Sequence, residues 1–351
     1  MDSIHIQGYK SIRDATIELK PINILIGANG SGKSNFLSFF ELLNNLYERK
    51  LQEYVALNGG MEKMLYKGRT DVQKISARIT FEDAINEYSF EMERGDDAFV
   101  FTDEKLWYNN NPWDISAHNT EAKVKVSGIY RASYVSKHLS NFKKYHFHET
   151  GKNSPFNQTS SVENDAYFLY GKGENLAAFL YTIKEKHFVV YNRIVKVIQS
   201  IAPYFSDFYL NPNENGLIRL QWQDKYSSTI YGSTDLSDGT IRFIALAVIF
   251  MQPTLPATII IDEPELGLHP FAIAKLAGLI KSVAAKSTQV IMATQSVELV
   301  SHFQPEDVLT VDQIEGESKF SRLNSDELSN WLETYSLGDL WKQNIIGKAQ
   351  P

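Results

Sequence analysis

The sequence has 351 residues, of which 43% are hydrophobic and 22% charged, enough for one large or two ordinary globular domains. Its formal net charge of −7 argues against a surface coated for non-specific nucleic-acid binding, and the absence of cysteine excludes disulfides and thiolate metal sites. No apolar run reaches the roughly 18 residues of a membrane span, and the first residues do not resemble a signal peptide. We therefore expect a cytoplasmic protein with no membrane partner.

The first informative segment follows a short apolar run at residues 22–26, which is typical of a buried parallel strand. Residues 27–34, GANGSGKS, match the G-x-x-x-x-G-K-S pattern of a phosphate-binding loop, and apolar residues follow at helical spacing. Glycines let the backbone N–H groups surround a phosphate at the helix N-terminus. We expect Lys33 to neutralise the β- and γ-phosphates of ATP and the Ser34 hydroxyl to bind Mg²⁺. The other expected nucleotide-binding residues of this segment are Asn29, Gly30, Ser31, Gly32 and Asn35.

The middle of the chain begins with alternating apolar and polar residues between 74 and 108, in the runs KISARITF, EYSFEMER, AFVFT and EKLWYN. This alternation predicts a small antiparallel sheet with turns at residues 83–84, 95–96 and 102–103. Farther on, between about residues 175 and 202, apolar side chains cover much of the helical surface. That pattern favours packing between helices, and it lacks the sustained heptads of a long coiled coil.

Basic and aromatic residues mix in the segment RASYVSKHLSNFKKYHFHET, at residues 131–150. Two interpretations are open: a DNA-binding segment, or an amphipathic helix followed by a strand. His146 and His148 alternate and would share one face of that strand. Together with Glu149 they suit a metal site, a γ-phosphate-sensing role or structural packing.

A polar turn at residues 236–240, LSDGT, precedes a strongly apolar helix; we call it the signature turn. Unpaired backbone N–H groups at such a helix start form a place for an anion, although the pattern alone is also that of an ordinary helix cap.

Two adjacent acids, Asp262 and Glu263, end a β-branched run at residues 258–261. Acids at the C-terminal end of a buried strand lie where ligands bind in open α/β sheets. We expect Asp262 to hold Mg²⁺ and Glu263 to accept a proton from an attacking water.

A helix at about residues 271–285 and a third strand at residues 287–296 complete a strand–helix–strand unit. This strand ends on Thr294, Gln295 and Ser296, which we call the switch residues. Their polar groups are candidates for sensing a γ-phosphate, whereas Ser296 is equally well explained as a helix cap.

Taken in order, the segments GANGSGKS, LSDGT, IIIDEP with ELGLHP, and ATQS resemble the ABC-type ATPase heads of the RecF, OLD and SMC-like group. YHFHETGKNSPF, NLAAFLY and YSLGDLWKQNIIG are also similar to a bacterial subfamily of AAA/ABC ATPases often found in anti-phage defence operons beside a small companion protein. The resemblance implies an α/β fold: an ABC-type P-loop head with a mostly parallel core sheet, an N-terminal antiparallel sheet and a helical lobe. We expect an N-terminal ATPase lobe at residues 1–125, an insertion lobe at 126–235 and a C-terminal ATPase lobe at 236–351.

The resemblance also implies roles for residues outside the phosphate loop. Ser237 and Gly239 would contact a γ-phosphate held by another subunit, and residues 267–269 match the D-loop that crosses the dimer interface of such heads. The N-terminal sheet would help to hold adenine. The basic or polar residues expected near the nucleotide there are Lys10, Ser11 and Arg13.

Two positions depart from the usual pattern of these heads. Asp238 stands where the LSGGQ signature of transporters has the first of its two glycines, and it adds an acid near phosphate. Gln295 stands where many ABC proteins have a switch histidine. Glutamine can donate a hydrogen bond but cannot act as a base at neutral pH, so proton abstraction falls on Glu263, with Lys33 and Gln295 as its catalytic companions.

The sequence thus predicts an ATPase that pairs as a homodimer, or a higher even oligomer, around two ATP molecules with Mg²⁺. It would regulate a separate effector, a nuclease or toxin, since the residues after Ser296 are too few for the Toprim domain of an OLD nuclease. Two alternatives are open: a RecF-like DNA-repair clamp that binds DNA across the dimer, and an ATP-dependent scaffold with little turnover. A transporter subunit fits less well, because of the signature variant, Gln295 and the extra middle residues.

Overall fold

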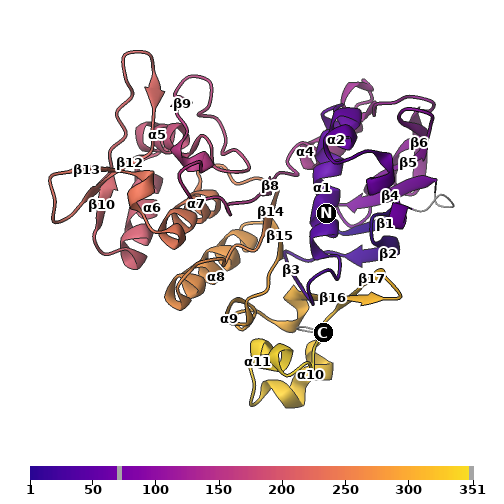
Figure 1. Ribbon diagram of the computed structural model, residues 1–351. Helices are drawn as coiled ribbons and strands as arrows, with labels where there is room; N and C mark the ends of the chain where they lie inside the picture. The colour runs from indigo at the N-terminus through magenta and orange to yellow at the C-terminus, as the bar shows by residue number, and fades with distance from the viewer. Residues whose placement is uncertain (69–72, 348–351) are drawn as a thin grey trace. The chain divides into compact units, whose positions relative to one another are not determined.

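The structure is a computed structural model that describes residues 1–68 and 73–347 (Figure 1). The chain forms two compact units. Unit 1 comprises Met1–Lys144, Ala257–Ile260 and Gln289–Pro351, and unit 2 comprises Tyr145–Pro256 and Ile261–Thr288.

The first sheet of unit 1 is antiparallel, in the order β2-β1-β4-β5-β6-β7. Side chains of β4 alternate between buried and partly exposed positions, so one face of the sheet covers the core, as the sequence pattern predicted. The strands are β1 (Ser3–Tyr9), β2 (Ile12–Glu18), β4 (Lys74–Phe81), β5 (Asn86–Arg94), β6 (Phe99–Tyr108) and β7 (Asn111–Ser116).

The turns predicted at residues 83–84 and 95–96 are confirmed, but the turn predicted at residues 102–103 is wrong. β6 continues through these residues as one strand. Thr102 is the extra residue of a β-bulge, with Phe101 opposite Met92 and Asp103 opposite Glu91. The polar pair that suggested a turn is therefore accommodated inside the strand.

The second sheet is the core sheet, in the order β17-β16-β3-β15-β14-β8. β3 is parallel to both β15 and β16, whereas β17 is antiparallel to β16, so the sheet is mostly parallel as expected. Every residue of β3 is buried. The strands are β3 (Ile22–Ile26), β8 (Lys144–Tyr145), β14 (Thr258–Asp262), β15 (Gln289–Ala293), β16 (Val308–Ile314) and β17 (Glu317–Arg322).

Helix α1 (Lys33–Tyr47) buries ten of its side chains in unit 1. Its Phe36 and Phe40 rings meet edge to face at 5.2 Å, and Phe39 meets Tyr9 of β1 at 5.0 Å. These rings belong to one core cluster that joins α1 to both sheets. The other helices of unit 1 are α2 (Leu51–Leu57), α3 (Met61–Met64), α4 (Ala132–Leu139), α9 (Val297–Val300), α10 (Ser325–Leu332) and α11 (Leu337–Lys342).

Unit 2 is built on helices that pack on one another, as predicted for residues 175–202. Phe243 and Ala247 of α7 pack against Ala272 of α8 and against partly buried Ile201 of α6. Within residues 1–68 and 73–347, no helix is long and apolar enough to cross a membrane. The helices are α5 (Leu176–Lys186), α6 (Phe188–Ile201), α7 (Asp238–Met251) and α8 (Pro270–Ala284), and the short strands are β9 (Ser160–Ser161), β10 (Phe205–Phe208), β11 (Leu217–Ile218), β12 (Gln221–Asp224) and β13 (Ile230–Gly232).

The two units differ from the three consecutive segments expected from the sequence. Residues 126–144 stay with the N-terminal part, and the signature turn joins the helical segment of unit 2. Residues 289–351 return to unit 1 because β15 and β16 both pair with β3. Pairing between strands far apart in the sequence, rather than chain order, sets the division.

Candidate functional site

The phosphate loop, residues 27–34, joins β3 to α1 and depends on its glycines. Gly27, Gly30 and Gly32 have positive φ angles of 150°, 80° and 113°. A Cβ atom on Gly27 would lie 2.2 Å from Val311 O, and one on Gly32 would lie 1.9 Å from Ser318 Oγ. Only glycine fits these positions, because the backbone lies against its neighbours and adopts angles that other residues disfavour.

Lys33 begins α1 and points back across the loop. Its Nζ donates to Gly27 O at 2.7 Å and to Ala28 O at 3.0 Å, and the residue is 7% exposed. The N-cap residue, Gly32, provides no side-chain acceptor for the first N–H groups of the helix. Ser31 Oγ is buried with no hydrogen-bond partner among the described residues. A buried ammonium, an orphaned hydroxyl and an uncapped helix start together fit a chain of phosphates.

Three polar side chains support the phosphate loop from behind. Asn35 Nδ2 donates to Ser11 Oγ at 2.7 Å, Ser318 Oγ donates to Ser31 O at 2.6 Å, and the hydroxyls of Ser318 and Ser11 are hydrogen-bonded at 2.8 Å. The network ties α1, the β1–β2 turn and β17 to the loop. The side-chain amide of Asn35, which was predicted to bind the nucleotide, thus donates its hydrogen bond to the β1–β2 turn.

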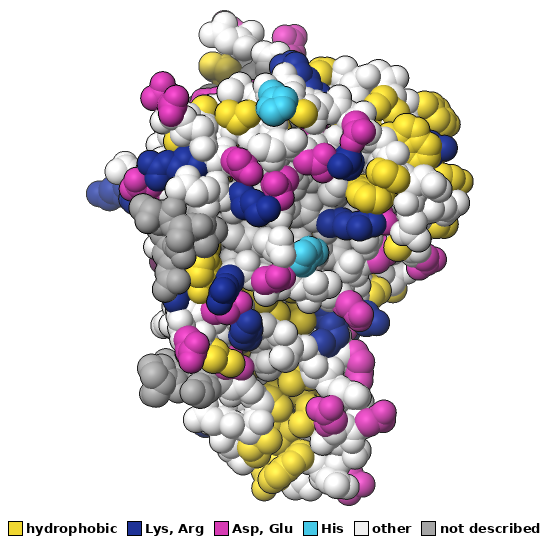
Figure 2. All heavy atoms as spheres, turned by 90° about the vertical axis from the view of Figure 1, so that its right-hand side faces the viewer, with side chains coloured by type: hydrophobic (Ala, Val, Ile, Leu, Met, Phe, Trp, Pro, Cys, Tyr) yellow, Lys and Arg dark blue, Asp and Glu magenta, His cyan; other side chains and the backbone are white. Residues whose placement is uncertain are grey.

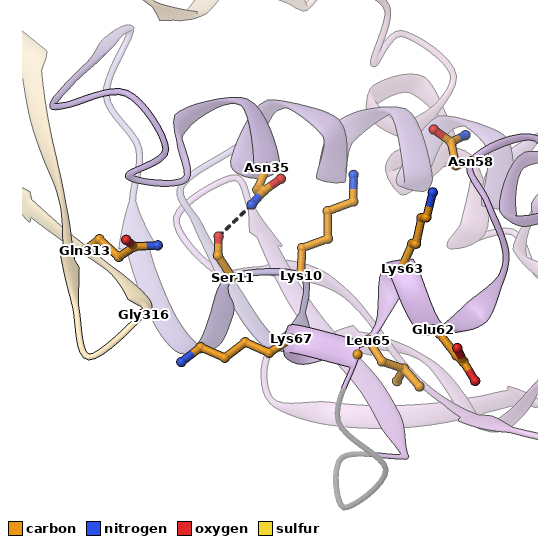
Figure 3. Close-up of a pocket in the computed structure, with 11 residues that line it drawn as sticks. Lys10, Ser11, Asn35, Asn58, Glu62, Lys63, Leu65, Lys67, Gln313 and Gly316 are labelled. Carbon is orange, nitrogen blue, oxygen red and sulfur yellow. Dashed lines mark hydrogen bonds between the residues drawn. The ribbon is translucent and has the colours of Figure 1, made fainter.

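An open pocket of about 760 Å³ lies in unit 1 and shares Ser11 and Asn35 with this network (Figure 3). Three lysines line it: Lys10 from the β1–β2 turn, Lys63 from α3 and Lys67 from the turn that follows. Lys10 Nζ donates to Ser38 Oγ at 2.9 Å, and burial lowers the pKa of Lys10. Glu62 lines it as well, so the pocket has a net positive charge, which attracts the phosphates of a nucleotide.

Of the N-terminal residues expected near a nucleotide, Lys10 and Ser11 line this pocket, and Arg13 does not. Arg13 is exposed on β2. Lys63, Lys67 and Ser318 were not singled out from the sequence, because each lies in a segment without a motif. The fold brings Lys63 and Lys67 to the pocket and Ser318 to the phosphate loop.

The switch residues follow β15, which is the parallel neighbour of β3. Thr294 N donates to Leu25 O at 3.1 Å, and Thr294 is fully buried whereas Gln295 is exposed. The phosphate loop and Gln295 therefore share the carboxyl edge of two adjacent strands in unit 1. Ser296 Oγ accepts from Leu299 N at 3.1 Å, which makes Ser296 the cap of α9, one of its two predicted roles.

β14 ends at Asp262, as predicted, and Glu263 follows with a φ angle of 45°. This left-handed conformation is rare for a non-glycine residue, and such strained residues cluster at functional sites. Ser34 belongs to unit 1 and Asp262 to unit 2. Their joint role as Mg²⁺ ligands stays a prediction.

His146 and His148 follow β8, which ends at Tyr145, so the prediction that they lie on a strand is wrong. Their rings still lie together, with centroids 3.8 Å apart, and His148 Nε2 lies 3.3 Å from Asp262 O. In the part of the chain that the structure describes, no group of three His, Asp or Glu side chains is placed to hold a metal ion. The geometry favours structural packing for this pair.

The signature turn caps α7 and faces the D-loop, residues 267–269. Ser237 Oγ accepts from Thr240 N at 3.2 Å. A Cβ atom on Gly239 would lie 2.3 Å from Gly267 O, so the two backbones touch. The signature turn and the D-loop line one pocket of about 310 Å³ in unit 2. Packing alone therefore requires glycine at positions 239 and 267, whether or not a ligand binds there.

The fold and these motifs define the class of protein. The structure is similar to an SMC head bound to the C-winged helix domain of ScpA, with a TM-score of 0.62 and 17% identity over 94% of this chain and 99% of that chain. It is also similar to an Smc head with an extended coiled coil bound to the C-terminal domain of ScpA, derived from Pyrococcus furiosus. There the TM-score is 0.58 and the identity 15%, over 95% of this chain and 98% of that chain. For the SMC head of Thermotoga maritima the TM-score is 0.50 and the identity 12%, over 92% of this chain and 98% of that chain. The chain therefore has the fold of an ABC-type P-loop ATPase head.

Residues 22–301 match the family described as "AAA domain, putative AbiEii toxin, Type IV TA system", and the chain belongs to this family. The match runs from β3 through the signature turn to the residue after α9. A curated relative, "Putative ABC transporter ATP-binding protein" of Streptomyces coelicolor, is 35% identical over 78 residues, which are 22% of this chain and 14% of that protein. The chain thus aligns with only a small part of that relative.

Proposed function

We propose that this protein hydrolyses ATP at sites that two copies of the chain complete together. The observation that carries the proposal is the pocket at the signature turn in unit 2, where a helix start and the D-loop form a concave surface, whereas the phosphate loop belongs to unit 1. The phosphate loop and the signature pocket are then two halves of one site. A twofold dimer brings each half against its counterpart, because the same two patches face each other twice.

Each residue has a defined task in such a site. Lys33 and the N–H groups of the phosphate loop hold the β- and γ-phosphates, and Gln295 donates a hydrogen bond to the γ-phosphate or to a water. Glu263 accepts the proton of the attacking water. From the second chain, Ser237 and the backbone of Gly239 close on the γ-phosphate.

Magnesium fits the oxygen ligands that the site offers. The Ser34 hydroxyl and the Asp262 carboxylate would hold the ion, which neutralises charge between the β- and γ-phosphates when bound. The adenosine end of ATP would occupy the 760 Å³ pocket, where Lys10 and Ser11 meet α1. Its volume is in the range of pockets for ligands of this size.

We further propose that the ATPase controls a separate effector in defence against phage. The description of the matching family, "putative AbiEii toxin, Type IV TA system", refers to a toxin–antitoxin system, which supports a role that depends on a second protein. On the face drawn in Figure 2, Lys and Arg side chains are interspersed with Asp and Glu side chains. That face gives no support to the DNA-clamp alternative. Expression with the neighbouring genes should reduce phage plating, and Lys33→Ala should abolish the protection.

Glu263→Gln tests the ATPase directly. We expect it to bind ATP but to release phosphate at least about 100-fold more slowly, since a general base contributes roughly that factor or more. Trapped ATP should then double the mass measured by light scattering, while ADP should leave a monomer. Unchanged phosphate release would show that Glu263 is not the general base, and an unchanged mass with ATP would argue against the dimer.

A further inference from the structure

Arg242 lies two residues after the signature turn and joins three segments of unit 2. It belongs to α7 and is half-buried. Its guanidinium donates to the segment that follows β8 and to the residue before the D-loop. The four acceptors are Phe147 O at 2.9 Å, His148 O at 2.8 Å, Leu266 O at 3.1 Å and Thr150 Oγ1 at 3.5 Å.

The D-loop is fitted around this guanidinium. Gly267 has a φ angle of 74°, and a Cβ atom there would lie 2.5 Å from Arg242 Nη1. On its other side, Gly267 O touches Gly239 of the signature turn. The D-loop turn is therefore enclosed between Arg242 and Gly239, and its position depends on both.

The contacts continue from Arg242 to the carboxylate segment. Arg242 Nη2 holds the carbonyl of His148, and the ring of the same histidine reaches Asp262 O at 3.3 Å. The signature turn, the D-loop and the end of β14 are thus linked within unit 2 by one arginine and one histidine. Each of the three segments carries residues of the proposed ATP site.

We propose that Arg242 is a positioning residue that fixes the signature turn, the D-loop and residues 146–150 as one body, so that the partner's γ-phosphate is met by a preformed surface. The inference rests on the proposed dimeric ATPase. Arg242 itself does not contact the nucleotide. Its effect is to hold Gly239 and Gly267 in place before the second chain arrives, which lowers the ordering cost of assembly.

The guanidinium suits this task better than another cation. Its donors leave a planar group in fixed directions, so one side chain can hold carbonyls from two segments at once. A lysine has a single ammonium on a flexible stem and cannot keep the same three carbonyls in fixed positions. Arg242→Lys should therefore preserve the charge but loosen the clamp.

Hydrogen exchange tests the clamp without ATP. In the full chain, Arg242→Lys should raise amide exchange in residues 146–150 and in residues 264–269 together, with a nearly unchanged melting temperature. Arg219→Ala is the matched control, because Arg219 also lies in unit 2 and donates from Nε to Thr159 Oγ1 at 2.7 Å. Exchange that is unchanged, or that rises in only one of the two segments, would overturn the inference.

Assembly in the Glu263→Gln background gives a second test. Adding Arg242→Lys should leave the Kd for a fluorescent ATP analogue unchanged but raise the protein concentration for half-assembly about 10- to 100-fold, as expected for losing hydrogen bonds from a charged donor. If Glu263→Gln alone fails to assemble, the dimeric ATPase proposal fails, and the exchange result still decides the clamp. If the double variant assembles like Glu263→Gln, or if ATP binding and assembly weaken equally, Arg242 has no positioning role.

Discussion

Gly239 shows that packing restricts the signature turn at the scale of a single residue. Its α-carbon faces Gly267 O so closely that a methyl group would approach that oxygen to 2.3 Å. The neighbouring Asp238 is explained by its position as the first residue of α7, where an acid is stabilised by the helix dipole. The sequence pattern pointed to an anion site at this turn, and the structure adds the close contact with the D-loop.

Gly239→Ala should therefore separate the signature turn from the D-loop. We expect a loss of about 1–3 kcal/mol in the free energy of unfolding, as for other overpacked sites, and the loss of ATP-dependent assembly. Urea unfolding and light scattering measure the two effects. Gly278→Ala in α8 is the control, because a Cβ atom there has no neighbour within 4 Å. The result would contradict our view of the turn if both variants assembled equally well.

Lys10 gives a prediction for the pocket of unit 1. Lys10→Gln removes a partly buried positive charge beside the proposed nucleotide site and so weakens the attraction for the phosphates of ATP. We expect the free energy of nucleotide binding to weaken by about 1 kcal/mol, or roughly fivefold in Kd. Titration with a fluorescent ATP analogue measures this. The exposed Lys286 of unit 2 supplies the control, since Lys286→Gln should leave the Kd unchanged. Equal Kd values for both variants would show that ATP does not bind in this pocket.

At the scale of elements, the motifs were predictable because they are local. β3, the phosphate loop and α1 follow one another without a break, and both the spacing and the apolar runs are visible in the sequence. β7 has no such signal: its side chains are exposed or half-exposed, so it lacks an alternating pattern. Lys63 and Ser318 escaped notice for another reason, since only the pairing of distant strands and the packing of α3 bring them to the site.

The contact between α11 and α9 links the C-terminal helices to the switch residues. A Cβ atom on Gly338 would lie 2.1 Å from Ser301 Oγ and 2.3 Å from Val297 O, so α11 packs directly on α9. Gly338→Ala should push the helices apart and lower the free energy of unfolding by about 1–3 kcal/mol. Urea unfolding followed by tryptophan fluorescence measures the loss, because Trp341 of α11 is buried. A variant as stable as the wild type would contradict this packing.

Helix α4 contributes a dependence of stability on pH through His138. Its ring stacks on Phe81 with centroids 4.6 Å apart, and burial, aided by the nearby N-terminal ammonium, lowers the pKa of His138 to about 4. The unfolded chain binds this proton with a pKa of about 6.5, so the unfolded state takes it up first as the pH falls. The stabilising contribution is complete above about pH 6.5 and is lost progressively toward pH 4.

The comparison of wild type with His138→Gln isolates this contribution from the carboxylates, which titrate in both proteins. Urea unfolding between pH 7 and pH 4 should give a steeper loss of stability for the wild type. Parallel curves would show that His138 is not held neutral in the folded chain.

At the scale of the whole molecule, the sequence predicted the class of fold, and the structure divides the chain into two compact units instead of three consecutive segments. The parallel pairing of β3 with β15 and β16 places these two late strands in unit 1, and such non-local pairing leaves no mark on local composition. The class itself was predictable because four motifs occur in the order typical of ABC-type heads. The two halves of the proposed ATP site were likewise identified from their motifs, although their meeting across a dimer is a proposal.

Complementation between two inactive variants tests the central claim most directly. Lys33→Ala disables the phosphate loop, and Ser237→Arg fills the signature pocket, so each variant alone should lack ATPase activity. A mixed dimer contains one intact site, made from the phosphate loop of one chain and the signature turn of the other. With random pairing, an equimolar mixture should recover about a quarter of the wild-type rate. A mixture of the two folded variants that stays inactive, or a Ser237→Arg protein that hydrolyses ATP at the wild-type rate by itself, would contradict an ATP site shared between two chains.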